Sequence, residues 1–93
     1  MGNSSNRFTK ELTVTNELGL HARAAAQVAQ LAGRANNVVW LQNGGTQVDA
    51  SSVIDILSLA CVKGSKITFV AEDHADKDIL EELTQLVEAG FGE

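Results

Sequence analysis

Hydrophobic residues recur at two different spacings along this chain of 93 residues, and the alternation between the two spacings limits its fold more than any other feature. Where apolar and polar residues alternate one by one, the pattern predicts a strand with one buried face. Where apolar residues recur every third or fourth position, it predicts an amphipathic helix. The chain contains no proline, and only short polar turns separate these stretches. The order β-α-β-β-α-β-α predicts an α+β fold, an open-faced β-sandwich in which a four-stranded antiparallel sheet carries three helices on one face.

Four stretches have the composition and the period of strands. In the first of them Phe8, Leu12 and Val14 fall on the same side. The sequence Asn43-Gly44-Gly45 is typical of a hairpin turn, and it joins the second strand to the third. The expected strands are residues 8–15, 38–42, 46–49 and 66–72.

Three stretches have the helical period. The first has a stripe of alanines and Val28, and such small side chains let a helix lie close to a sheet. The second is short and is preceded by hydroxyl side chains suited to capping. The third is the clearest amphipathic helix, with an acidic side expected to face solvent that includes Asp76. The expected helices are about 22–32, a short one containing 53–57, and about 75–89.

The length allows one domain with one modest core, which we assign to residues 8–93, and residues 1–7 are expected to form a mobile N-terminal tail. The net charge of -5 argues against binding to nucleic acid or to an anionic membrane, because there is no basic stripe. No apolar run is long enough to span a bilayer. The single cysteine, Cys61, lies in an apolar stretch and is expected to be a buried thiol. A chain of this kind suits a reducing cytoplasm.

The stretch from Asn16 to Ala26 is the candidate functional site. Gly19 gives the backbone freedom just before the first helix, and His21 falls at or beside the N-terminus of that helix. There the first backbone N–H groups lack intrahelical partners and the helix dipole is positive, so an anion can bind. The guanidinium of Arg23 adds a positive charge suited to phosphate. A lone histidine near a helix start is usually a surface residue, but an imidazole beside an anion site suggests a histidine that carries a phosphoryl group.

Two motifs carry a resemblance to a known family. The first, Leu18-Gly19-Leu20-His21-Ala22-Arg23, closely resembles the active-site motif of HPr, the histidine phosphocarrier of the bacterial phosphotransferase system. The second, residues 48–59 followed by Lys63-Gly64, looks like the regulatory-serine segment of that family. The resemblance extends from about Lys10 to the end of the chain, at the spacing of the family.

The resemblance implies a fold and a function. It implies the HPr-like sandwich, with His21 as the covalent phosphoryl site at Nδ1 and Arg23 offsetting charge during transfer. The phosphoryl group would come from the phosphoenolpyruvate-dependent Enzyme I and leave to Enzyme IIA domains in sugar uptake. The protein would be a monomeric carrier without cofactor or metal, rather than a stand-alone catalyst. The phosphate-cradling backbone would be that of Ala22, Arg23 and Ala24.

Further positions match the family's regulatory and docking residues. Ser52 matches the regulatory serine, which a serine kinase modifies where that regulation is used. Four apolar residues match the patch that docks partners, although from the pattern alone they could equally be core. These four residues are Ala26, Val53, Ile54 and Leu57.

The sequence departs from the family pattern at several positions. Most members carry proline where Ala24 stands, so a less rigid helix start is expected. Many members carry lysines on the first helix where this chain has Gln30 and Gly33, and Asp55 adds an acid beside the second helix. These changes concern partner recognition. His74, in an acidic run, is expected to be a solvated loop residue.

Two alternatives to a sugar-transport carrier stay open. Residues 52–54 and the closing Ala89-Gly90-Phe91 also resemble the nitrogen-related branch of the family, whose phosphorylation serves regulation without sugar flux. The other alternative is a binding module of the same fold whose histidine is never phosphorylated. The His21 and Arg23 pair discriminates against this second alternative, because a pure binding module needs neither.

Overall fold

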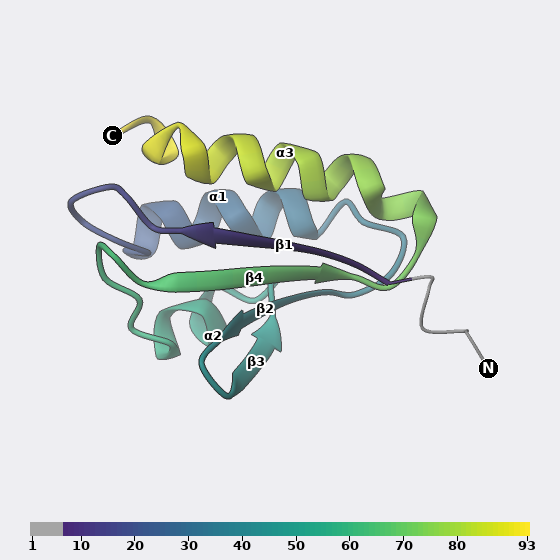
Figure 1. Ribbon diagram of the computed structural model, residues 1–93, viewed down its shortest axis with the longest axis horizontal. Helices are drawn as coiled ribbons and strands as arrows, with labels where there is room; N and C mark the ends of the chain where they lie inside the picture. The colour runs from purple at the N-terminus through teal and green to yellow at the C-terminus, as the bar shows by residue number, and fades with distance from the viewer. Residues whose placement is uncertain (1–6) are drawn as a thin grey trace.

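The computed structural model describes residues 7–93 and contains one four-stranded sheet with the strand order β1-β4-β2-β3 (Figure 1). All neighbouring strands are antiparallel, as the sequence predicted. The tail expected at residues 1–7 lies outside the described residues except for Arg7. The strands are β1 Phe8–Thr13, β2 Val39–Asn43, β3 Thr46–Asp49 and β4 Lys66–Ala71.

Three helices complete the predicted α+β sandwich. Helices α1 and α3 lie side by side against the sheet, and α2 lies beside α1 at the end of the sheet near β3 (Figure 1). None of the helices between residues 7 and 93 has the length and apolar content needed to cross a bilayer. The helices are α1 Ala22–Ala32, α2 Val53–Ser58 and α3 Lys77–Glu88, with 3-10 turns η2 His74–Asp76 and η3 Gly90–Gly92.

The core lies between the sheet and the helices. In the central strand β4, Ile67 and Phe69 are fully buried, and Phe69 pairs in register with Leu41 of β2. Because side chains alternate across a strand, these residues share the face that the helices cover. From the helices, Val28 and Leu83 are also fully buried. The predicted period-two and helical stripes therefore meet in one core.

Cys61 is buried, as the sequence predicted, in the connection between α2 and β4. Burial raises the pKa of its thiol, and a hydrogen bond with Ser65 offsets part of that rise. A raised pKa disfavours the thiolate, which is the reactive form. Cys61 is thus a packing residue in this fold.

The prediction that Asp76 faces solvent is wrong. Its side chain is 1% exposed, and its two carboxylate oxygens accept the backbone N–H groups of Asn36 and Asn37 at 2.7 and 2.8 Å. The error arose because α3 begins at Lys77 rather than near Ala75, so Asp76 precedes the helix. From that position the carboxylate accepts two backbone N–H groups of the loop between α1 and β2 and so joins this loop to the start of α3.

Candidate functional site

A tight loop between β1 and α1 sets the position of His21. Gly19 has φ +64, and a Cβ there would lie 2.5 Å from the carbonyl oxygen of Cys61, so only glycine fits. The next residue, Leu20, is buried and donates its N–H to the same carbonyl at 3.0 Å. These contacts fasten the loop to the connection between α2 and β4. The residue that follows is therefore held at a defined place.

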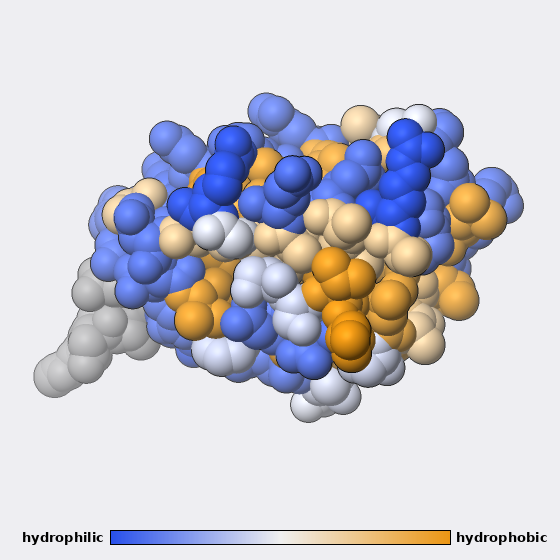
Figure 2. Space-filling view, turned by 180° about the vertical axis from the view of Figure 1, so that it is seen from behind, coloured by the Kyte–Doolittle hydropathy of each residue, from blue (hydrophilic) through white to orange (hydrophobic). Residues whose placement is uncertain are grey.

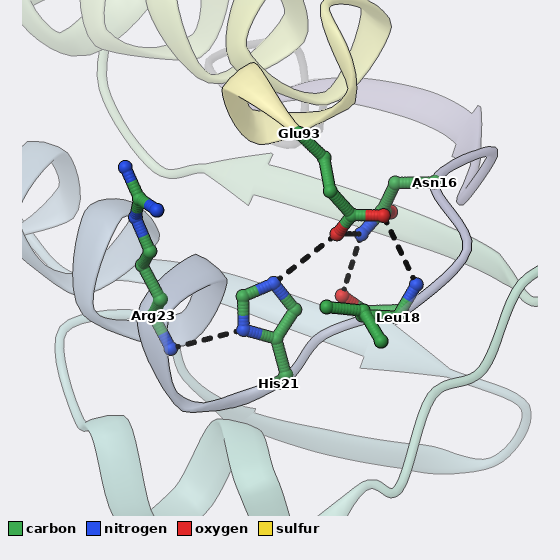
Figure 3. A network of polar contacts seen from close by, with 6 residues as sticks. Asn16, Leu18, His21, Arg23 and Glu93 are labelled. Atoms are coloured by element: carbon green, nitrogen blue, oxygen red, sulfur yellow. Dashed lines mark hydrogen bonds and ion pairs between the residues drawn. The ribbon is translucent and has the colours of Figure 1, made fainter.

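His21 is the N-cap of α1. Its backbone is extended, and its Nδ1 accepts the N–H of Arg23 at 3.2 Å (Figure 3). The ring thereby satisfies one of the donors that a helix start leaves without an intrahelical partner. The imidazole is only partly covered, with 27% of its side chain exposed. The predicted position at the helix N-terminus is confirmed.

Arg23 reaches His21 through its backbone and not through its guanidinium. The side chain points away from the imidazole (Figure 3) and forms no hydrogen bond or ion pair with any residue in the range 7–93. Its neighbours in the predicted phosphate cradle differ in exposure, since Ala22 is exposed and Ala24 is fully buried. In this conformation, the backbone N–H groups of the first turn of α1, and not the guanidinium, are the donors available to an anion beside His21.

The carboxylate of Glu93 is a part of the site that the sequence analysis missed. Its Oε2 lies 3.3 Å from Nε2 of His21 and accepts a hydrogen bond from Nδ2 of Asn16 at 2.8 Å. Its Oε1 accepts the N–H of Leu18 at 3.2 Å (Figure 3). The hydrogen bond from Asn16 is the main cause that lowers the pKa of Glu93, with smaller contributions from Leu18 and His21. The carboxylate is therefore held in its charged form.

The closing 3-10 turn brings Glu93 to this place. Gly90 and Phe91 have φ values of +65 and +59, which turn the chain back at the end of α3. The ring of Phe91 is buried and anchors the turn. Glu93 and Asn16 are 77 positions apart in the sequence, so no local spacing could reveal the contact. The apolar Phe91 between two glycines was the only available signal that this segment packs against the fold.

Exposed apolar side chains gather over α2 and beside the first turn of α1 (Figure 2). Of the four residues that could have been core or interface, Ala26 is exposed, Val53 is partly buried, and Ile54 and Leu57 are 78% and 39% exposed. The buried residue of this helix is Ile56. The sequence analysis missed two further exposed residues on the loops nearby. We call the following set the apolar patch: Leu18, Ile54, Leu57 and Val62.

Ser52 caps α2, as predicted. Its backbone is extended and its Oγ accepts the N–H of Asp55 at 3.2 Å. His74 is exposed but not free of contacts, because its ring meets the edge of Phe8 with 4.6 Å between centroids. It precedes α3, which begins at the opposite end of the sheet from the start of α1 (Figure 1). The fold therefore keeps the two histidines apart.

Comparison with known proteins agrees with the fold. A family model described as "PTS HPr component phosphorylation site" matches residues 8–89. The phosphocarrier protein HPr of Cupriavidus necator is 37% identical over 84 residues, covering 90% of this chain and 94% of that protein. The phosphocarrier protein NPr of Shewanella violacea is 32% identical over 87 residues, covering 94% of this chain and 96% of that protein.

A solved structure gives the same result in three dimensions. HPr-C-His from Thermoanaerobacter tengcongensis superposes with a TM-score of 0.84 at 29% identity, over 92% of this chain and 97% of its own. The resemblance seen in the two sequence motifs is thus supported over nearly the whole chain. The chain belongs to the HPr family, the phosphocarriers of the phosphotransferase system.

Proposed function

We propose that this chain accepts a phosphoryl group on Nδ1 of His21 from Enzyme I and passes it to an Enzyme IIA domain in sugar uptake. The observation that carries the proposal is the 3.2 Å contact between Nδ1 of His21 and the N–H of Arg23 at the start of α1. At this position a nucleophilic nitrogen lies beside the positive end of a helix, where the charge of a phosphoryl group is stabilised.

The transfer requires mainly positioning and electrostatics from the protein. The lone pair of Nδ1 attacks phosphorus, and a new N–P bond forms while the bond to the donor breaks and its electron pair stays with the donor. The N–H of Arg23 then loses Nδ1 as its acceptor and is directed at the phosphoryl oxygens. Helix geometry also leaves the N–H groups of Ala22 and Ala24 without intrahelical partners, so both belong to the proposed cradle.

The guanidinium of Arg23 has a separate role in this proposal. It is exposed and forms no hydrogen bond or ion pair within residues 7–93, so it can rotate toward the phosphoryl group without breaking such an interaction. An arginine presents several donors in a planar fork that fits phosphate oxygens. We therefore assign charge neutralisation during transfer to this side chain and positioning of the oxygens to the backbone.

We assign partner docking to the apolar patch together with Ala26 and Val53. Exposed apolar groups beside a reactive residue are typical of a protein interaction surface. Apart from Arg23, the region of the first helix offers little positive charge to such partners, since Arg34, just after the helix, is paired with Glu82 at 2.7 Å. Ser52 at the edge of α2 is the proposed regulatory site for a serine kinase, because a phosphate there would add charge to this surface.

A regulatory carrier of the nitrogen type is the second candidate. The 32% identity to the NPr of Shewanella violacea supports this candidate. The 37% identity to the HPr of Cupriavidus necator is higher, so the nitrogen type stands second. An unphosphorylated binding module is disfavoured by the His21 and Arg23 pair. In each case we propose a single domain at residues 8–93 that works as a monomer in the cytoplasm.

The experiment combines a charging step with a discharging step. Incubation with phosphoenolpyruvate and Enzyme I is expected to add the mass of one phosphoryl group, in a bond that acid breaks. Addition of a sugar-specific Enzyme IIA domain should then remove that mass. A chain that takes up no acid-labile phosphate contradicts the carrier function. A charged chain that discharges only to a nitrogen-type Enzyme IIA domain assigns it to the regulatory branch.

A further inference from the structure

The imidazole of His21 has a different partner at each nitrogen. Nδ1 faces an N–H donor, the backbone amide of Arg23 at 3.2 Å, so this nitrogen must present a lone pair. Nε2 lies 3.3 Å from an acceptor, the carboxylate Oε2 of Glu93, so the negative charge there favours a proton on this nitrogen. Both partners select the same neutral tautomer, with the proton on Nε2.

Glu93 is itself fixed in place. Both of its carboxylate oxygens accept hydrogen bonds, from Nδ2 of Asn16 and from the N–H of Leu18. Asn16 is 6% exposed, and its Nδ2 also donates to the carbonyl of Gly19 at 2.9 Å. Its Oδ1 is buried and has no hydrogen-bond partner within residues 7–93, which costs free energy. The amide is thus oriented for its two acceptors, one of which is Glu93.

We propose that Glu93 is a positioning residue that keeps a proton on Nε2 of His21, so that Nδ1 and not Nε2 takes the phosphoryl group. This inference rests on the proposed function. A carboxylate that orients a catalytic imidazole and fixes its tautomer is a known arrangement in other enzymes. Here the carboxylate also repels a phosphoryl group from the Nε2 side of the ring.

The same contact acts on the product of transfer. When Nδ1 attacks phosphorus, the bond to the donor breaks and its electron pair leaves with the donor, while the proton stays on Nε2. The ring then carries one positive charge, which the Glu93 carboxylate at 3.3 Å offsets. No proton has to move in this step, so the transfer needs no general base or general acid.

The test compares Glu93→Leu with Glu88→Leu, an exposed acid at the end of α3, as the matched control. Nitrogen-15 NMR of the His21 ring in alkaline buffer reports the tautomer without any phosphoryl donor. We expect the Nε2-protonated form to dominate in the parent and the control. In Glu93→Leu we expect its population to fall and that of the Nδ1-protonated form to rise. We also expect the turnover rate with Enzyme I to fall at least about tenfold in Glu93→Leu with KM unchanged, because part of the rings then adopt the unreactive tautomer.

The outcomes separate this inference from the proposed function. An unchanged tautomer ratio in Glu93→Leu overturns the inference and leaves Glu93 as a tether for the turn η3. A shifted ratio with an unchanged turnover rate also overturns it, because the tautomer then does not govern transfer. If the parent takes up no phosphoryl group at all, the proposed function fails, while the tautomer measurement still decides whether Glu93 positions the ring.

Discussion

His21 is both a helix cap and the proposed nucleophile, and the two roles use the same nitrogen. In the unmodified protein Nδ1 accepts the N–H of Arg23 and so stabilises the first turn of α1. Phosphorylation would remove that acceptor but would supply phosphoryl oxygens to the same donor. Because negative charge at a helix N-terminus is favourable, the modified residue remains a good cap. We therefore expect α1 to persist when His21 is phosphorylated and dephosphorylated.

Glu93 predicts a specific pH dependence of stability. Hydrogen bonding from Asn16 lowers its pKa below the ordinary value of 4.5, so its charged form is stabilised in the folded state relative to the unfolded state. This stabilisation is complete above the unfolded pKa and is lost as the pH falls through the lower folded pKa. We expect Glu93→Gln to melt at a lower temperature than the parent near neutral pH, by a small amount. Below the folded pKa the two melting curves should converge, and a difference that persists there would contradict the account.

At the scale of secondary structure, α2 depends on its cap. Ser52 is the N-cap, and its Oγ accepts the N–H of Asp55. Ser52→Ala should lower the free energy of unfolding by about 1 kcal/mol, the typical cost of a lost cap. Ser52→Asp should preserve stability, since aspartate caps equally well, but it should slow transfer from Enzyme I by adding charge beside the apolar patch. Urea denaturation and transfer rates of both variants test this, and Ser52→Asp transferring as fast as the parent would reduce Ser52 to a cap.

The start of α3 is joined to the loop before β2 by Asp76. Its carboxylate accepts two backbone N–H groups, those of Asn36 and Asn37, while fully buried. Asp76→Leu removes the acceptor of both donors and should cost about 1–3 kcal/mol, the typical penalty for a hydrogen-bonding group that loses its partner. The exposed Glu81 provides the control, and Glu81→Leu should stay close to the parent in urea denaturation. Equal stability of the two variants would show that the buried carboxylate is dispensable.

These elements show what the sequence could predict and where it failed. His21 and Ser52 were placed correctly as residues at helix starts, because turn residues and caps act over a few positions. Asp76 was placed wrongly, since its partners are 39 and 40 positions away. Glu93 was missed for the same reason, as its partner Asn16 is 77 positions away. Local chemistry predicted the caps of α1 and α2, whereas the start of α3 and the contacts across the fold depend on packing that no spacing reveals.

At the scale of the whole molecule, the two ends of the sheet carry different groups of residues. The start of α1, the closing turn and the apolar patch meet at one end, where Glu93 contacts His21. At the other end, Asp76 joins the start of α3 to the loop before β2, and the ring of His74 contacts the ring of Phe8 at the start of β1. We therefore propose that phosphoryl chemistry is confined to the end that holds His21 and that the other end has a structural role.

The two histidines allow the most direct measurement of this claim. Intact mass spectrometry after incubation with phosphoenolpyruvate and Enzyme I should show one acid-labile phosphoryl group on the parent and on His74→Ala. His21→Ala should show none and should keep a cooperative melting transition, which rules out unfolding as the cause. An acid-labile phosphoryl group on folded His21→Ala, or its loss in folded His74→Ala, would contradict the assignment of the phosphoryl site to the start of α1.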